Sequence, residues 1–134
     1  MLNFKQIFTP AAAGRTLQVA LVLLAIFHVG TLAGVVPAEI VLGGQIIDST
    51  ELIIKEAIAL FVTLMFLLVV TLRLRDIRMR LDRRGPRIGV WIIAAYFAVN
   101  LIGNLASGVA AENTIFAPIT VILAILALRT GLNK

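Results

Sequence analysis

A run of basic residues between long apolar stretches most constrains how this chain can fold. Residues 73–87 hold seven of its twelve Lys and Arg residues. The apolar stretches on either side are each about twenty residues long, enough for a helix to cross about 30 Å of hydrocarbon. Loops rich in Lys and Arg stay on the cytoplasmic side of such helices. We therefore predict a cytoplasmic loop with a pair of membrane-spanning helices on each side.

The whole chain is predicted to be one integral membrane domain, residues 1–134. Its composition is 60% apolar and only 14% charged, which is too little charge to cover a water-soluble surface. We expect an all-α, four-transmembrane-helix antiparallel bundle made of two hairpins. The first apolar stretch is too long for an ordinary signal peptide, so we expect it to remain as a span. The spans are expected at residues 16–36, 52–72, 88–111 and 115–128.

The remaining charges are distributed as this topology requires. With both termini inside, eleven of the twelve Lys and Arg residues are cytoplasmic, and Lys55 is the exception. The outer segments carry acidic residues instead: Glu39, Asp48, Glu51 and Glu112. The pattern predicts a protein of the bacterial inner membrane with both termini in the cytoplasm.

Several helix ends are expected from capping residues. Thr9 followed by Pro10 is typical of a helix start, and Pro37 is expected to end the first span. Residues 48–51 (Asp-Ser-Thr-Glu) are expected to start the second span, with a small capping residue among them and an acid in the first turn.

The basic segment is expected to continue as helix for about two turns. Asp76 precedes Arg80 by four residues, a spacing that favours an ion pair. Gly85 and Pro86 are then expected to end the helix. Residues 112–114 are expected to form a tight turn between the third and fourth spans.

The arginines also predict contact with anionic lipid headgroups, although topology alone would explain them. Each Lys or Arg near an anionic leaflet contributes about 1 kcal/mol to membrane binding. An amphipathic stretch, residues 1–10, is expected at the same interface. Nucleic acid is not expected as a partner, because the basic residues flank spans and no soluble aromatic platform accompanies them. The predicted headgroup residues are Arg73, Arg75, Arg78, Arg80, Arg83, Arg84 and Arg87.

Composition excludes several kinds of chemistry. The chain has no Cys and a single His, which excludes disulfides, thiol catalysis, thiolate metal sites and His-rich metal sites. No glycine pattern for nucleotide binding is present. His28 and Ser107 could pair on paper, but no acid is placed to orient the histidine. We expect no metal, no cofactor and no enzymatic activity.

Glu56 is the most costly residue for a membrane protein to bury. A carboxylate within a span costs several kcal/mol unless it is paired, solvated or protonated. Thr63, seven residues later, projects from the same helix face. Glu56 is a rim carboxylate near water or Lys55, a site for a cation, a proton or a substrate, or one partner in a purely structural interhelical bond. Lys55 itself follows Glu51 by four residues in the favourable order.

The third span carries a polar stripe. Asn100, Asn104 and Ser107 follow an i, i+4, i+7 spacing, which places them within about 60° on a helix. Such a face must point into protein or a wet cavity rather than into lipid. The stripe is either a helix-packing surface, with Gly103 allowing close approach, or the wall of a hydrophilic pocket.

The first span contains the only histidine. His28 is either a hydrogen-bonded packing residue or part of a proton relay. Gly30 and Gly34 lie roughly opposite it in a G-x-x-x-G pattern, which favours close helix packing within the bundle or between protomers.

The depth of these groups suggests a function. His28, Glu56, Asn100 and Asn104 fall in the outer half of the membrane, counted at about 1.5 Å per residue. We expect a polar cavity open to the outside, or covered by the loop at Gly43, above an apolar inner plug.

The leading hypothesis is a small transporter or channel-like protein for a cation, a proton or a small polar solute. Four short spans rarely enclose a path alone, so a homo-oligomer or a larger membrane partner is expected. The alternative is a non-catalytic accessory or assembly subunit, or a lipid-binding membrane protein.

Overall fold

The computed structural model describes residues 8–37, 48–108, 110 and 112–132, and these residues are helical with short connections. Four of the helices are long and apolar enough to cross a membrane, the last of them over Asn113–Gly131. The prediction of an all-α, four-helix membrane protein is confirmed at this level. The helices are α2 (Pro10–Leu32), α3 (Ser49–Met79), α4 (Arg84–Ala106), the short π-helix η3 (Glu112–Phe116) and α5 (Ala117–Gly131).

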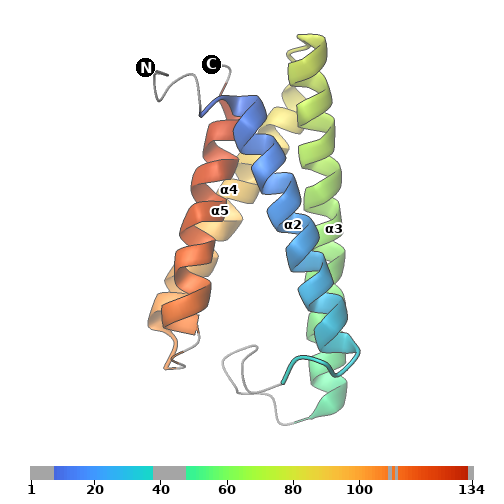
Figure 1. Cartoon of the computed structure of the whole chain (residues 1–134), viewed down its shortest axis with the longest axis vertical. Helices are drawn as coiled ribbons and strands as arrows, with labels where there is room; N and C mark the ends of the chain where they lie inside the picture. The colour runs from blue at the N-terminus through green and yellow to red at the C-terminus, as the bar shows by residue number, and fades with distance from the viewer. Residues whose placement is uncertain (1–7, 38–47, 109, 111, 133–134) are drawn as a thin grey trace.

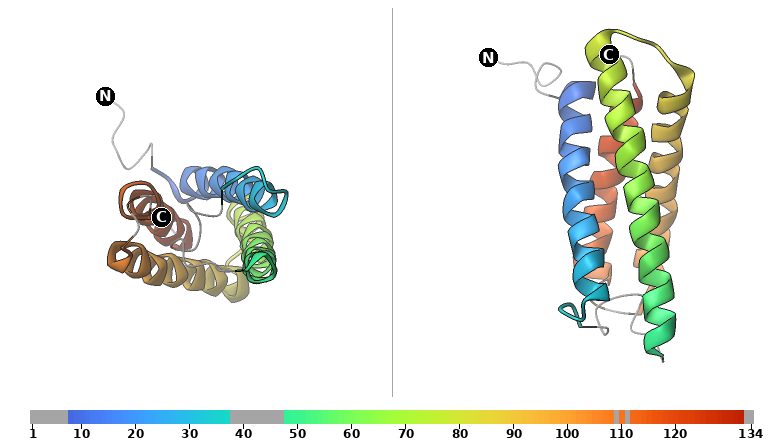
Figure 2. Two further views of the ribbon diagram at one scale, coloured as in Figure 1. Left: turned by 90° about the horizontal axis from the view of Figure 1, so that it is seen from below. Right: turned by 90° about the vertical axis from the view of Figure 1, so that its right-hand side faces the viewer.

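The helices form a four-cornered bundle when viewed end-on (Figure 2). α2 contacts α3 most extensively and α4 contacts α5 most extensively, while the α2–α5 and α3–α4 contacts are smaller. α2 begins and α5 ends at the same end of the molecule where α3 passes into α4 (Figure 1). We call the half that contains this end the basic half, and the other the far half. α2 and α5 diverge toward the far half.

Both helix starts predicted from capping residues are confirmed. The Thr9 side chain accepts a hydrogen bond from the Ala12 N–H at 3.1 Å, and a proline occupies the first helical position. The Asp48 carboxylate accepts from the Thr50 N–H at 3.0 Å. Each cap satisfies a backbone donor that the first turn leaves without an intrahelical partner.

The end of the first span differs from the prediction. α2 ends at Leu32, and Ala33 is its C-cap, so Pro37 does not end the helix. Gly34 adopts a left-handed conformation with φ of +79°, which glycine adopts without steric cost. A left-handed glycine just beyond the last turn is a common helix terminator, and here it acts before the proline is reached.

The connection between α3 and α4 also differs. The helix continues for about two turns into the basic segment, as predicted, but it ends at Met79 with Arg80 in a left-handed conformation. The Leu81 N–H donates to the Asp76 carbonyl at 2.9 Å, which closes the helix end. Residues 85–86 therefore do not end α3, and instead lie in the first turn of α4.

α4 is shorter than the predicted third span. It ends at Ala106, with Ser107 as its C-cap. Residues 112–114 belong to η3 rather than to a tight turn. The Asn113 side-chain amide donates to the Ser107 carbonyl at 2.9 Å, which ties η3 to the end of α4. Several predictions fall outside the described residues: the amphipathic stretch up to residue 7, Glu39, and the loop at Gly43.

The packed core lies in the basic half. All four long helices contribute buried apolar side chains to one cluster there, and no charged residue belongs to it. Side chains of this size each gain about 1.5–3 kcal/mol on full burial relative to water, and in a bilayer their contribution comes from packing instead. The cluster contains Ala13, Leu17, Leu21, Val70, Val90, Ile93, Ala94, Phe97, Leu123, Leu126 and Ala127.

Close helix contacts in the basic half depend on glycines that the sequence did not single out. A Cβ placed on Gly89 would lie 2.6 Å from Val69 Cγ1, and one on Gly14 would lie 2.7 Å from Leu74 Cδ2. Gly131 packs against an indole ring in the same way. These glycines let neighbouring helices approach more closely than any larger residue would allow.

The glycines predicted to form close helix contacts, Gly30, Gly34 and Gly103, have few or no described side chains near them. Around Gly34 and Gly103, no described side chain lies within 4 Å of where a Cβ would be. Gly30 approaches only Val36 among the described residues, at 3.5 Å. Since Gly34 lies beyond the end of α2, the G-x-x-x-G pattern does not form a seam along one helix face within the described chain.

Candidate functional site

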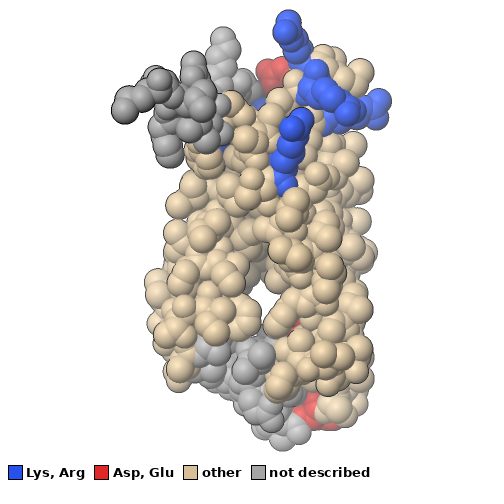
Figure 3. All heavy atoms as spheres, in the orientation of Figure 1, with Lys and Arg blue, Asp and Glu red and all other residues tan. Residues whose placement is uncertain are grey.

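A cavity of about 240 Å³ lies in the far half of the bundle, where α2 and α5 diverge. The space-filling view shows an opening through the molecule in this half, away from the Lys and Arg side chains (Figure 3). Every long helix contributes to the cavity wall, as does η3. Its polar lining residues are His28, Glu56, Thr63, Asn100, Asn104 and Thr120.

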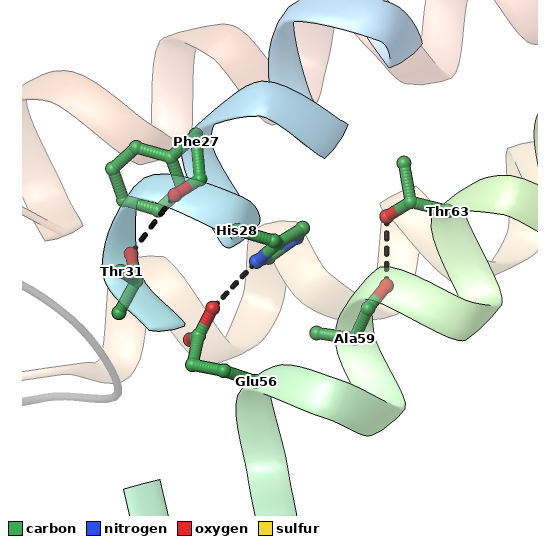
Figure 4. A network of polar contacts seen from close by, with 6 residues as sticks. All are labelled: Phe27, His28, Thr31, Glu56, Ala59 and Thr63. Carbon is green, nitrogen blue, oxygen red and sulfur yellow. Dashed lines mark hydrogen bonds and ion pairs between the residues drawn. The ribbon is translucent and has the colours of Figure 1, made fainter. Parts of the chain in front are cut away.

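Glu56 and His28 form an interhelical pair at the wall of this cavity. Glu56 Oε2 lies 2.7 Å from His28 Nδ1, and the two side chains are only 3% and 13% exposed. The carboxylate comes from α3 and the imidazole from α2, and they point toward one another (Figure 4). Lys55 instead pairs with Glu51 at 2.6 Å, in the predicted i, i+4 arrangement. The carboxylate is therefore held by the histidine and not by the neighbouring lysine.

The pair can exchange protons without changing its geometry. An ionised Glu56 accepts a hydrogen bond from the Nδ1–H of His28, whereas a protonated Glu56 donates one to Nδ1. The second imidazole nitrogen, Nε2, provides another protonation site. The pair can therefore be negative, neutral or positive according to the number of protons it holds.

Threonine hydroxyls close to the pair bond to their own helices. Thr63 donates to the Ala59 carbonyl at 2.8 Å and Thr31 donates to the Phe27 carbonyl at 3.0 Å (Figure 4). Both hydroxyls are buried and have satisfied donors, as a membrane interior requires. Thr63 lines the cavity, and its oxygen can still accept a hydrogen bond from a ligand.

Two of the three residues of the predicted polar stripe of α4 line the cavity. The Asn104 side-chain amide donates to Thr120 Oγ1 at 2.9 Å, which joins α4 to α5 while both residues line the cavity. Asn100 lines the cavity one turn closer to the basic half. Ser107 does not line it, because α4 has ended there. The predicted stripe thus supplies both a packing bond and a polar wall, but from two residues rather than three.

Aromatic rings and aliphatic side chains provide the rest of the wall, and the rings were not among the residues predicted for the site. Phe66, Tyr96 and Phe97 contact one another edge to face, with centroids 5.0 to 5.9 Å apart. Phe27 and Phe116 form a second edge-to-face pair at 5.9 Å. All five rings line the cavity. In a span, aromatic residues resemble ordinary lipid-facing or core residues, so the sequence carried no specific signal for them.

The basic end contains a second polar cluster. Arg73 is only 2% exposed, and its Nε donates to the Thr130 carbonyl at 3.2 Å and its Nη2 to the Leu132 carbonyl at 3.4 Å. These carbonyls lie at the end of α5, where the helix dipole favours a cation. Asp76 is fully buried and accepts from Arg83 Nε at 2.7 Å. This hydrogen bond raises the pKa of Arg83, which therefore stays protonated at any physiological pH.

The seven arginines predicted to contact lipid headgroups lie in three different environments. Arg73 is directed into the bundle, so the prediction that it contacts lipid headgroups is wrong. Arg83 and Arg87 pair with Asp76 and Asp82 within the chain. Four others are exposed at the basic end: Arg75, Arg78, Arg80 and Arg84.

Comparisons with known protein families, with curated proteins and with solved structures find no match to this chain. The chemistry of the site therefore has to be inferred from its own residues. Among the described residues, no three His, Asp or Glu side chains are grouped so as to hold a metal ion. The titratable chemistry of the cavity resides in Glu56 and His28.

Proposed function

We propose that this chain is a small membrane carrier that takes up and releases a proton at Glu56 and His28 in exchange for a cation or small polar solute. One observation carries the proposal. A carboxylate that is 3% exposed pairs with a titratable imidazole, at 2.7 Å, on the wall of a cavity. A charge at this depth is costly, and ionisable residues inside spans commonly mark proton or ion pathways. A histidine partner adds a second group that can hold or release a proton.

The direction of access follows from the proposed topology. We place both termini and residues 73–87 in the cytoplasm of a bacterial inner membrane, with neighbouring helices antiparallel. The far half, with its cavity, then faces outward, and the packed core blocks the cytoplasmic side. The conformation described is therefore outward-facing in this proposal.

Transport also requires a conformation open to the cytoplasm. The α2–α3 and α4–α5 contacts are more extensive than the α2–α5 and α3–α4 contacts. Rocking of one hairpin against the other would therefore break the smaller interfaces and keep the larger ones. A second copy of the chain, packed on the exposed apolar faces, would support such a movement, so we propose that the carrier is a homo-oligomer.

Cysteine labelling tests the topology cleanly because the native chain has no cysteine. Ser49→Cys, at the far end, should react in intact cells with a maleimide that cannot cross the membrane. Gly85→Cys, at the basic end, should react only after the membrane is permeabilised. The opposite pattern would reverse the orientation and turn the cavity toward the cytoplasm.

Proton flux tests the function. Purified protein in sealed liposomes should dissipate an imposed pH gradient when an exchangeable solute is present, as reported by an internal pH dye. Glu56→Gln should reduce this flux to that of protein-free liposomes, since the amide cannot hold a proton for release. Glu51→Gln is a matched control, because that carboxylate is 43% exposed and pairs with Lys55 away from the cavity. Equal flux in wild type and Glu56→Gln would overturn the proposal.

A lipid-binding or accessory role is the second candidate, supported by exposed arginines at the basic end, among them Arg75, Arg78, Arg80 and Arg84. In this case anionic lipid should raise the thermal stability of the protein, at about 1 kcal/mol per arginine near the surface. Replacing Arg75, Arg78, Arg80 and Arg84 together by Gln should remove that dependence. A dependence on anionic lipid without any proton flux would favour this candidate over the carrier.

A further inference from the structure

We propose that the ligand of the cavity is a small organic ammonium ion, held between the aromatic rings and the carboxylate of Glu56. The inference rests on the proposed function and names its substrate class. Three properties of the cavity support this ligand: the side chains of its wall, the charge that the Glu56–His28 pair can carry, and its volume.

The wall of the cavity suits a cation without a tight water shell. Two sets of rings line it, Phe66 with Tyr96 and Phe97 in one, and Phe27 with Phe116 in the other. Aromatic faces attract quaternary and other organic ammonium groups through the ring quadrupole, by about 0.5–2 kcal/mol per ring. A strongly hydrated inorganic ion would lose its water here, and the phenylalanine rings of the wall offer it no oxygen ligand.

The carboxylate supplies the opposite charge. An ionised Glu56 at 3% exposure is poorly solvated, so a cation beside it lowers the cost of keeping it charged. A neutral solute carries no charge to offset that of the ionised Glu56. Asn100 and the oxygen of Thr63 add polar groups on the same wall, which suits a ligand with one hydroxyl or N–H group.

The volume limits the ligand to a small one. Pockets for drug-sized ligands usually measure about 300–1,000 Å³, and this cavity is about 240 Å³. The space-filling view shows the opening running sideways through the far half, across the long axis of the bundle (Figure 3). The space therefore suits an ammonium ion with a few carbons better than a large aromatic dye.

Binding and proton release are linked by charge balance. When the pair is neutral it holds one exchangeable proton, on Glu56 or on His28. Entry of the ammonium ion expels that proton and leaves Glu56 ionised, bonded to the Nδ1–H of His28. The net charge within the cavity is unchanged, no covalent bond forms or breaks, and one proton leaves for each cation bound.

Choline and its neutral isostere 3,3-dimethyl-1-butanol provide a matched pair of probes. Titration calorimetry on the protein in lipid nanodiscs should detect choline binding, and the alcohol should bind at least about tenfold more weakly. Repeating the titration in buffers of different ionisation enthalpy should show proton release with choline. Glu56→Gln should lose both the binding and the release.

A second pair of variants tests whether the aromatic rings contribute to choline binding. Phe66→Leu should weaken choline binding by about fivefold, equivalent to about 1 kcal/mol of cation–π attraction. Phe61→Leu, on the same helix but 62% exposed and outside the cavity lining, should leave binding unchanged. Thermal unfolding of each variant shows whether it remains folded.

These experiments distinguish a failure of the ammonium-ligand proposal from a failure of the carrier proposal. Proton flux in liposomes without choline binding, or equal binding of choline and the alcohol, would overturn the ammonium ligand and leave the carrier in place. Choline binding that depends on Glu56, without any proton flux, would overturn the carrier and support a binding protein for the same ligand class.

Discussion

Two buried carboxylates on α3 have contrasting partners. Asp76 in the basic half is fully buried and accepts a hydrogen bond from a guanidinium, Arg83. Glu56 in the far half is almost as buried and pairs with an imidazole, His28. A guanidinium keeps its proton at any physiological pH, whereas an imidazole does not. The two carboxylates therefore differ more in the kind of partner they pair with than in their depth of burial.

The surroundings of the two carboxylates reinforce the contrast. Around Asp76 the helices are tightly packed, and Arg73, one turn earlier on α3, ties the helix to the carbonyls at the end of α5. The second oxygen of Asp76, Oδ2, is buried and has no hydrogen-bond partner among the described residues. Around Glu56 there is a cavity with aromatic and amide walls. One half is filled by packed side chains, and the other contains the cavity.

The largest effect on stability is expected from Arg73→Gln. Removing this buried cation leaves Asp76 with less compensating charge and leaves the Thr130 carbonyl without its charged donor. Loss of one partner in a buried ionic cluster typically costs about 3–5 kcal/mol. Thermal unfolding in detergent should show the loss, whereas the exposed Arg75→Gln should unfold like wild type. Equal unfolding of the two variants would show that the basic cluster is not structural.

Gly89→Ala is expected to have the next largest effect. The new methyl group would lie 2.6 Å from Val69 Cγ1, so α3 and α4 must separate or repack, at about 1–3 kcal/mol. Gly103→Ala is the control in the far half of the same helix, where no described side chain lies within 4 Å of the position. It should be neutral or stabilising by up to about 1 kcal/mol. Similar losses in both variants would contradict the difference in packing between the halves.

Asn104→Leu should destabilise the protein modestly. It removes the 2.9 Å hydrogen bond to Thr120, and such interhelical bonds in membranes contribute about 0.6 kcal/mol on average. A double-mutant cycle with Thr120→Val, followed by thermal unfolding, measures the coupling between the two side chains. A coupling near zero would mean that the contact serves only to shape the cavity wall.

Glu56→Gln should change stability little and yet abolish proton flux. The glutamine amide can still donate a hydrogen bond to Nδ1 of His28, so we expect a change within about 1 kcal/mol. Assembly, measured by size-exclusion chromatography, should be unchanged. Loss of folding or assembly in this variant would instead make Glu56 a structural residue like Asp76.

The coarse fold could be predicted from the sequence because span length, charge bias and capping residues act locally. Thr9 and Asp48 cap their helices as expected, since a cap depends only on residues two or three positions away. Helix ends were harder to predict. Gly34 ends α2 before Pro37, and the end of α4 at Ala106 removes Ser107 from the polar stripe.

The candidate site was only partly predictable. Depth alone suggested that Glu56, His28 and the two asparagines lie near one another, but which residue pairs with Glu56 depends on how each helix is rotated about its axis. The nearby Lys55 was a reasonable alternative, yet the partner comes from a different helix. Arg73 was assigned to lipid for a similar reason, because the sequence does not show that α5 ends beside it.

Infrared spectra of the reconstituted protein test most directly whether Glu56 exchanges a proton within the membrane. Stepping the buffer from acid to alkaline reports the loss of protonated carboxyl groups, and a buried carboxyl absorbs apart from the exposed ones. We expect one such buried signal to change in wild type and in Asp76→Asn, and to be absent from Glu56→Gln. A signal that persists in Glu56→Gln and disappears in Asp76→Asn would place the exchanging carboxyl at the basic end and contradict the contrast drawn between the two halves.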